Sequence, residues 1–197
     1  MTRQALIIVD VQNDFLPGGS LAAPHGDEII PVINKLLDKN RDKKLFSLII
    51  ATQDWHPENH ESFKTLWPVH CVQHSHGAEL AQNLNHSKID KIIHKGQNPE
   101  IDSYSAFFDN NHQQKTELDE YLKKNDITDV YILGLVTDYC VKFSVLDAIS
   151  LGYKTYLIED GCRGVNLKPG DDQKAIDEMK NQGAVIIQSS SLLKTRI

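Results

Sequence analysis

The hydrophobic positions of the chain fall into short runs, and these runs are separated by segments with helical periodicity. Six runs rich in β-branched and aliphatic residues predict buried strands at residues 5–11, 46–52, 89–94, 130–134, 153–158 and 184–187. Apolar residues at helical spacing predict helices over residues 29–37, 118–122 and 141–149, and a more polar helix is expected at 171–181. This alternation predicts a mostly parallel sheet covered by helices on both faces, which is a three-layer α/β/α fold.

The domain organisation follows from the length and from two long connections. We expect a single domain over residues 1–197, because no repeat, low-complexity tract or linker divides the sequence. Residues 55–87 and 96–111 are longer than simple connections between a strand and a helix. Connections of this size usually carry function or minor structure, so we expect functional residues within them.

Charge and composition exclude several classes of protein. The 21 basic and 27 acidic residues give a net charge of −6, and the basic residues do not cluster, so nucleic acid is not an expected partner. The apolar runs are too short to span a membrane, and the N-terminal run is too short for a signal peptide. We therefore expect a cytoplasmic protein with no membrane partner. Three cysteines do not form a disulfide framework, so each is considered as a thiol.

Polar side chains follow four of the predicted strands. Asp10 ends the first apolar run, and Asp54, Lys95 and Cys140 follow the second, third and fourth runs. Ligands of open α/β sheets bind beyond the carboxyl ends of the strands, so these four residues are expected to meet at one edge.

Three of these residues suit covalent catalysis. Cys140 is expected in the first turn of a helix, where free N–H groups and the helix dipole favour the thiolate, although a packing thiol is the alternative. Asp10 follows four aliphatic residues and needs a partner if it is buried. Lys95 would supply that partner and stabilise an anionic intermediate; the alternative is a strand-end lysine that reaches solvent. Cys162 has no comparable context and is interpreted as a packing thiol.

The segment after the second strand carries metal-ligand residue types. Asp54, His56 and His60 lie within seven residues, and His70 follows in the same connection. One carboxylate with two or three imidazoles suits a divalent metal such as zinc, iron or manganese, and leaves positions for water or substrate. Solvated loop histidines are the alternative interpretation.

A second group of ligand types lies close to the first. Cys71, His74 and His76 form a weaker candidate, because no second cysteine pair accompanies them. The aromatic residues Phe15 and Trp67 lie on segments that leave the same sheet edge, as does Tyr104. Together these rings are candidate walls of a slot for a flat substrate, although aromatic residues are more often part of a core.

Five blocks of sequence resemble one known family. LIIVDVQNDFLPGGSL, TQDWHPENHESF, WPVHCV, HKGQNPEIDSYSAFFDN and GLVTDYCVKFSVLDA occur in the order found in nicotinamidases of the isochorismatase-like cysteine hydrolase superfamily. The resemblance covers residues 5–165. It implies a six-stranded parallel sheet and deamidation of nicotinamide to nicotinate and ammonia in NAD salvage. Pyrazinamide is an expected second substrate, because a pocket cannot strongly reject a close isostere.

The resemblance also implies roles for individual residues. Asp10, Lys95 and Cys140 match the catalytic triad, and a cis peptide bond is expected at 135–136. The N–H groups of Val136 and Cys140 match an oxyanion hole. Residues matching Asp54, His56 and His70, often with His60, bind one divalent metal ion, most simply zinc. The rings of Phe15, Trp67 and Tyr104 match positions that enclose the substrate ring.

Two alternatives remain open from the sequence. The first is a related cysteine amidohydrolase of the same superfamily that acts on another small amide. The second is a non-enzymatic binding module, which predicts a glycine-rich phosphate turn; the only candidate, PGGS at residues 17–20, lacks the required pattern. The sequence leaves open whether the protein forms a homo-oligomer. It also leaves open whether His60 binds the metal directly or through a water molecule.

Overall fold

A computed structural model gives the fold for residues 3–40 and 44–194. Its strands are β1 (Gln4–Val9), β2 (Leu48–Asp54), β3 (Lys91–Lys95), β4 (Asp129–Leu135), β5 (Lys154–Arg163) and β6 (Val185–Ile187). Its α-helices are α1 (Ile29–Lys39), α2 (Ser62–Thr65), α3 (Leu118–Lys124), α4 (Lys142–Ser150), α5 (Asp171–Asn181) and α6 (Ser189–Leu193).

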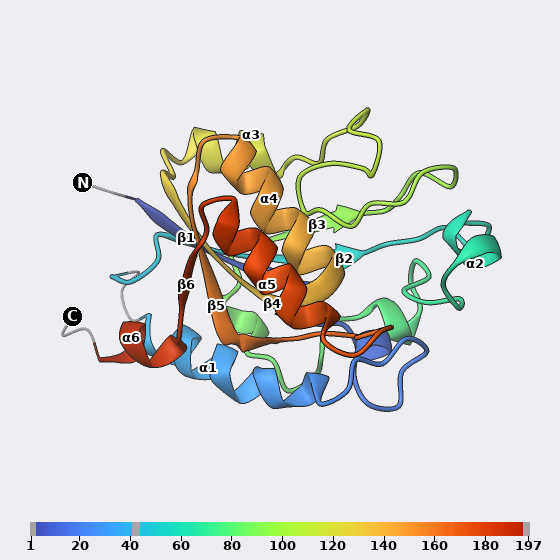
Figure 1. The fold of residues 1–197 in the computed structure, drawn as a ribbon, viewed down its shortest axis with the longest axis horizontal. Coiled ribbons are helices and arrows are strands. Elements are labelled where there is room, and N and C mark those ends of the chain that lie inside the picture. Colours follow the sequence, from blue (N-terminus) through green and yellow to red (C-terminus); the bar gives the residue numbers. More distant parts are fainter. Residues whose placement is uncertain (1–2, 41–43, 195–197) are drawn as a thin grey trace.

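The strands form one six-stranded sheet in the order β3-β2-β1-β4-β5-β6, and every neighbouring pair is parallel. The helices α1 and α6 lie along one face of this sheet, and α4 and α5 lie side by side on the other (Figure 1). The central strand β1 is buried from Ala5 to Val9, as expected for a strand covered on both faces. The predicted three-layer α/β/α fold is therefore confirmed.

The strand order determines where a ligand can bind. The chain proceeds from β1 to β2 and β3 in one direction and then returns across the sheet to β4 and β5. The order therefore reverses between β1 and β4, and a crevice opens beyond the carboxyl ends of strands at such a reversal. The first four strands end around this point, and they carry the polar residues that the sequence singled out.

Three elements differ from the sequence prediction. β5 continues to Arg163 rather than ending at residue 158. The hydrophobic pattern ended the predicted strand too early, because Glu159 and Asp160 interrupt the run within the strand. β3 is an edge strand, so Ile92 is 42% exposed instead of buried. The fourth strand is followed by a π-helical turn, Thr137–Val141, before α4 begins.

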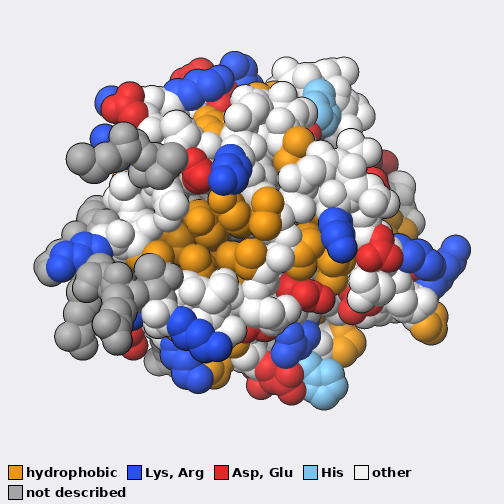
Figure 2. All heavy atoms as spheres, turned by 60° about the vertical axis from the view of Figure 1, so that its left-hand side comes forward, with side chains coloured by type: hydrophobic (Ala, Val, Ile, Leu, Met, Phe, Trp, Pro, Cys, Tyr) orange, Lys and Arg blue, Asp and Glu red, His pale blue; other side chains and the backbone are white. Residues whose placement is uncertain are grey.

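The surface gives little further indication of function. None of the helices in the described ranges is long and apolar enough to cross a membrane. The face on the left of Figure 1 carries a band of hydrophobic side chains among charged ones (Figure 2). Apolar atoms make up much of any folded protein's surface, so this band alone does not identify a partner.

Candidate active site

Asp10 is held at the end of the central strand by a hydroxyl group on the neighbouring strand. It follows β1 directly in a left-handed conformation with φ of 47°, which aspartate tolerates better than most residues. The Thr52 hydroxyl donates a hydrogen bond to Asp10 Oδ1 at 2.6 Å, and the Asp10 N–H donates to Thr52 Oγ1 at 3.2 Å. Asp10 has no solvent exposure, so its carboxyl group is fixed and buried.

Lys95 joins the two buried carboxylates at the sheet edge. Its Nζ atom lies 2.8 Å from Asp10 Oδ2 and also contacts Asp54 Oδ1. A third contact, at 2.8 Å, is the backbone oxygen of Ser103. Lys95 is only 2% exposed, so the alternative of a strand-end lysine reaching solvent is wrong. Burial of this ammonium group is offset by its acceptors, as a buried charge requires.

Cys140 lies against this cluster from the fourth strand. Its Sγ atom is 3.5 Å from Lys95 Nζ, and it lies within 4.8 Å of a carboxylate oxygen of Asp10. The π-helical turn that carries the thiol is closed by N–H groups of Tyr139 and Val141, which donate to the Val136 carbonyl oxygen. The peptide bond between residues 135 and 136 is cis, as the resemblance implied. The structure thus brings together the three residues of the expected triad.

The protonation states in this cluster are set mainly by burial and by Lys95. Burial raises the pKa of Asp10 to about 6, although Lys95 opposes the rise. Burial also raises the pKa of the Cys140 thiol well above its usual range, and Lys95 only partly counters this effect. Burial alone would lower the pKa of Lys95, but Asp10 and Asp54 raise it well above its usual range. These pKa directions favour a neutral resting thiol that needs a base, rather than the thiolate that the helix start alone would favour.

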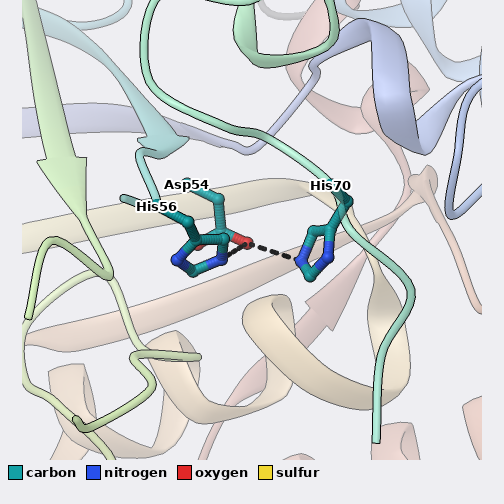
Figure 3. Close-up of side chains that lie close together, drawn as sticks. All are labelled: Asp54, His56 and His70. Atoms are coloured by element: carbon teal, nitrogen blue, oxygen red, sulfur yellow. Dashed lines mark ion pairs between the residues drawn. The ribbon is translucent and has the colours of Figure 1, made fainter. Parts of the chain in front are cut away.

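Asp54, His56 and His70 present ligand atoms to a common point beside the triad. Asp54 Oδ2 lies 3.6 Å from His56 Nε2 and 4.0 Å from His70 Nε2 (Figure 3). One atom from each of the three residues lies within 4.8 Å of the other two. The opposite oxygen of Asp54 contacts Lys95, so a single carboxylate connects the catalytic cluster to the imidazoles.

The imidazoles are oriented by their second nitrogen atoms. His56 Nδ1 donates to the Gly96 carbonyl oxygen at 2.8 Å, and His70 Nδ1 donates to the Pro68 carbonyl oxygen at 2.7 Å. A Cβ atom at position 96 would lie 2.4 Å from the His56 ring, so only glycine allows this approach. His56 Nε2 is buried and has no hydrogen-bond partner among the described residues. This arrangement fits a divalent metal, whose histidine ligands usually donate their other N–H group to an oxygen.

His60 packs against His56 but does not converge with Asp54 and His70. Its ring centroid is 4.1 Å from that of His56, and its Nδ1 atom is 2.7 Å from Ser62 Oγ. Its buried Nε2 atom has no hydrogen-bond partner in the described part of the chain. His60 forms a group with His56 and Asp102 instead of joining Asp54 and His70. Its binding to the metal stays a prediction.

The second ligand set proposed from the sequence is dispersed. His74 packs edge-on against Trp55, with ring centroids 5.2 Å apart. His76 is exposed and pairs with Glu79 at 3.2 Å. Within residues 3–40 and 44–194, no group of metal-ligand atoms includes Cys71, His74 or His76. The first set is therefore the better candidate.

A pocket connects the thiol, the metal-ligand group and the aromatic rings. The Trp67 Nε1–H donates to the Tyr104 hydroxyl oxygen at 3.1 Å, which fixes two of the three expected rings. Tyr139 packs edge-on against Trp67 with a centroid separation of 5.0 Å. The pocket is lined by Phe15, Leu21, Asp54, Trp67, His70, Asp102, Tyr104, Val136, Tyr139, Cys140 and Val165.

Sequence reasoning missed several residues of this pocket. Tyr139 directly precedes the expected nucleophile, so its position in the chain was an available signal. Asp102 and Leu21 lie in loops without periodicity, and the Ser103 contact to Lys95 is made by a backbone oxygen that no residue type reveals.

Comparison with known proteins defines the class to which this fold and site belong. The family model described as Isochorismatase domain matches residues 4–191, so the chain belongs to this family. The nicotinamidase of Escherichia coli (strain K12) is 48% identical over 204 residues, which cover 94% of this chain and 95% of that relative.

Two solved structures share the fold at high identity. PnC1 from L. infantum, in complex with nicotinate, has a TM-score of 0.89 and 39% identity, covering 96% of this chain and 94% of its own. The pyrazinamidase of Pyrococcus horikoshii, in complex with zinc, has a TM-score of 0.82 and 42% identity, covering 94% of this chain and 99% of its own.

Proposed function

We propose that this chain is a nicotinamidase, an amidohydrolase that cleaves the carboxamide C–N bond of nicotinamide to give nicotinate and ammonia. The observation that carries this conclusion is the buried contact of Lys95 with both Asp10 and Cys140 beside an aromatic pocket. The high identity to a curated nicotinamidase and the nicotinate held by the L. infantum relative support the choice of substrate.

The first step is attack by the sulfur of Cys140. Because the resting thiol is neutral, Asp10 removes its proton, and the thiolate then attacks the carboxamide carbon. Lys95 keeps its proton and stabilises the negative charge that develops in the cluster. The backbone N–H groups of Val136 and Cys140 are proposed to donate to the oxyanion of the tetrahedral intermediate.

The second half of the reaction releases the two products. Asp10 returns its proton to the amide nitrogen, because an amine is a poor leaving group unless it is protonated. Ammonia departs and a nicotinoyl thioester remains on Cys140. Asp10 then deprotonates a water molecule, which attacks the thioester carbon. As the C–S bond breaks, Asp10 returns that proton to the Cys140 sulfur, and the acid leaves as nicotinate after its proton passes to the released ammonia.

A divalent metal would be held by Asp54, His56 and His70, and we also propose His60 as a ligand, directly or through water. Mixed oxygen and nitrogen donors suit zinc, and the related pyrazinamidase is solved with zinc; iron or manganese would accept the same donor types. When bound, such a metal supplies a positive centre that attracts the pyridine nitrogen of the substrate or a water molecule.

The aromatic side chains would orient the substrate ring. Phe15, Trp67 and Tyr104 line the pocket around Cys140, and flat rings bind well between such side chains. Pyrazinamide differs from nicotinamide by one ring atom, so we propose that it is also accepted.

Substrate profiling of the purified protein tests this function. Nicotinamide and pyrazinamide should release ammonia and the matching acid, whereas aliphatic amides and carbamoyl amino acids should give less than about one-hundredth of that rate. Faster turnover of a non-aromatic amide would transfer the assignment to a related cysteine amidohydrolase. The absence of turnover with every amide would contradict the proposal. A role in NAD salvage and a cytoplasmic location stay predictions.

A further inference from the structure

Asp14 connects the N-terminal loop to the connection that follows β2, and it does not line the pocket. Its Oδ2 atom accepts a hydrogen bond from the Cys71 N–H at 2.7 Å. Its Oδ1 atom accepts from the N–H and the hydroxyl of Ser20, at 3.3 and 3.2 Å. Its backbone oxygen accepts from the Leu21 N–H at 2.9 Å. One carboxylate thereby holds the N-terminal loop against the connection that follows β2.

The carboxylate of Asp14 occupies space beside Gly77 that a larger residue at that position would fill. A Cβ atom at Gly77 would lie 2.0 Å from Asp14 Oδ2, so any other residue there would displace the carboxylate. The space for the Asp14 carboxylate therefore depends on the absence of a side chain at Gly77.

The hydrogen bond to Cys71 fixes the backbone that carries a metal-ligand candidate. The N–H of Cys71 belongs to the peptide group that joins it to His70. Cys71 has a φ of 46°, a left-handed conformation that costs a residue other than glycine about 1 kcal/mol and needs support from its surroundings. The Cys71 carbonyl oxygen in turn accepts from the His56 N–H at 3.0 Å. Cys71 therefore links the Asp14 carboxylate to the backbone of both His56 and His70.

The loop that Asp14 anchors through Ser20 also forms part of the pocket wall. Phe15 follows Asp14 in the chain, and its ring lies 5.7 Å from the His70 ring, measured between centroids. Phe15 and Leu21 both line the pocket. Asp14 is absent from every group of converging metal-ligand atoms in the described ranges, so its influence on the site is indirect.

We propose that Asp14 is a positioning residue that holds His70 at ligand distance from Asp54 and His56 while it fixes the Phe15 wall of the pocket. Removal of its carboxylate would free the peptide group before Cys71, and the three ligand atoms would no longer be preorganised. This inference rests on the proposed metal site, and it extends the proposed function to a residue that touches neither substrate nor metal.

Zinc binding by three variants tests the proposal. Wild type, Asp14→Ala and Asp14→Asn are stripped of metal and titrated with Zn²⁺ against a coloured chelator. Asp160→Ala is the matched control, because Asp160 also accepts from a backbone N–H and a hydroxyl, both of Ser189, at 2.7 and 2.5 Å. Thermal unfolding of the stripped proteins shows how far each change affects the fold alone.

The expected result is a Zn²⁺ affinity at least about 10-fold weaker in Asp14→Ala, as is usual when a residue supporting a ligand is lost. Asp14→Asn keeps one oxygen acceptor and should lie between Asp14→Ala and wild type. Asp160→Ala should bind Zn²⁺ within about twofold of wild type, even where it lowers the melting temperature. If Asp14→Ala does not fold, the Asp14→Asn variant alone decides.

Equal Zn²⁺ affinity in wild type and the Asp14 variants would overturn the proposal. A loss of Zn²⁺ affinity in Asp160→Ala as large as that in Asp14→Ala would also overturn it, as would a wild type that binds no Zn²⁺. The titration contains no nicotinamide. If nicotinamide is not the substrate, the ammonia assay will show no turnover, while the Zn²⁺ affinities of the variants can still differ as proposed.

Discussion

The ammonium group of Lys95 lies 2.8 Å from Asp10 Oδ2, and neither side chain has solvent-exposed atoms. The same ammonium group also contacts Asp54, so one cation lies between two buried carboxylates. The arrangement keeps Asp10 available as a base, and it holds the Cys140 sulfur 3.5 Å from a fixed positive charge. Stability and catalysis therefore depend on the same contact.

Replacement of Lys95 by methionine should damage both properties. Lys95→Met keeps an unbranched side chain, one atom shorter, but leaves Asp10 and Asp54 without their cation. Loss of one partner from a buried ion pair costs about 3–5 kcal/mol, so the free energy of unfolding of the metal-free protein should fall by that amount. Urea denaturation measures the change, and nicotinamide turnover should be lost.

A double variant provides the control for this prediction. Asp10→Asn combined with Lys95→Met removes one of the unpaired carboxylates and should recover part of the stability without recovering turnover. Wild-type stability in the Lys95→Met variant would show that the ion pair does not have the energetic role described here.

The activity should decline in acid as Asp10 gains a proton. Burial raises the pKa of Asp10 to about 6, and the base is active only as the carboxylate. The value of kcat/KM for nicotinamide should therefore fall about tenfold for each pH unit below 6 and be level above 7. The profile is recorded with saturating Zn²⁺, and metal content is checked at each pH, because protonated histidines also release metal. A level profile from pH 7 to 4.5 would contradict the role of Asp10.

The hydrogen bond from Trp67 to Tyr104 should affect substrate binding more than chemistry. Trp67→Phe keeps an aromatic ring but removes the N–H that donates to the Tyr104 hydroxyl at 3.1 Å. A neutral hydrogen bond contributes about 0.5–1.5 kcal/mol, so KM for nicotinamide should rise about 2–10-fold, with kcat within about twofold.

Tyr104→Phe removes the same bond from its other side and should have the same effect. The double variant should raise KM little further than either single variant, because each of the three variants lacks the same Trp67–Tyr104 hydrogen bond. A fall in kcat at constant KM would instead assign the pair to the chemical step.

The fold was predictable because its strands are continuous hydrophobic runs. β1 and β4 are buried on both faces, and the rule that chemistry lies beyond parallel strand ends placed Asp10 and Lys95 correctly at one edge. The extension of β5 to Arg163 was not predictable, since Glu159 and Asp160 interrupt its pattern. The strand order follows from packing between distant segments, which the pattern of a single strand does not encode.

The site was predictable in its residue types and less so in its geometry. The residue types alone do not separate His60 from His70; only the family resemblance made His60 an occasional ligand, and in the structure His60 groups with Asp102 while His70 groups with Asp54. The difference arises from loop conformations, which have no hydrophobic period. The protonation of Cys140 depends on burial, which a strand-to-helix pattern does not reveal: the start of a helix favours the thiolate, but burial raises the pKa of the thiol.

The most direct test of the central claim is ammonia release from nicotinamide by wild type and Cys140→Ala, assayed side by side at equal metal content. Wild type should release ammonia and nicotinate in equal amounts. The variant should fold, bind Zn²⁺ and show less than about one-thousandth of the wild-type rate, because the nucleophile is lost. Turnover of nicotinamide by Cys140→Ala at the wild-type rate would contradict a thioester mechanism at Cys140.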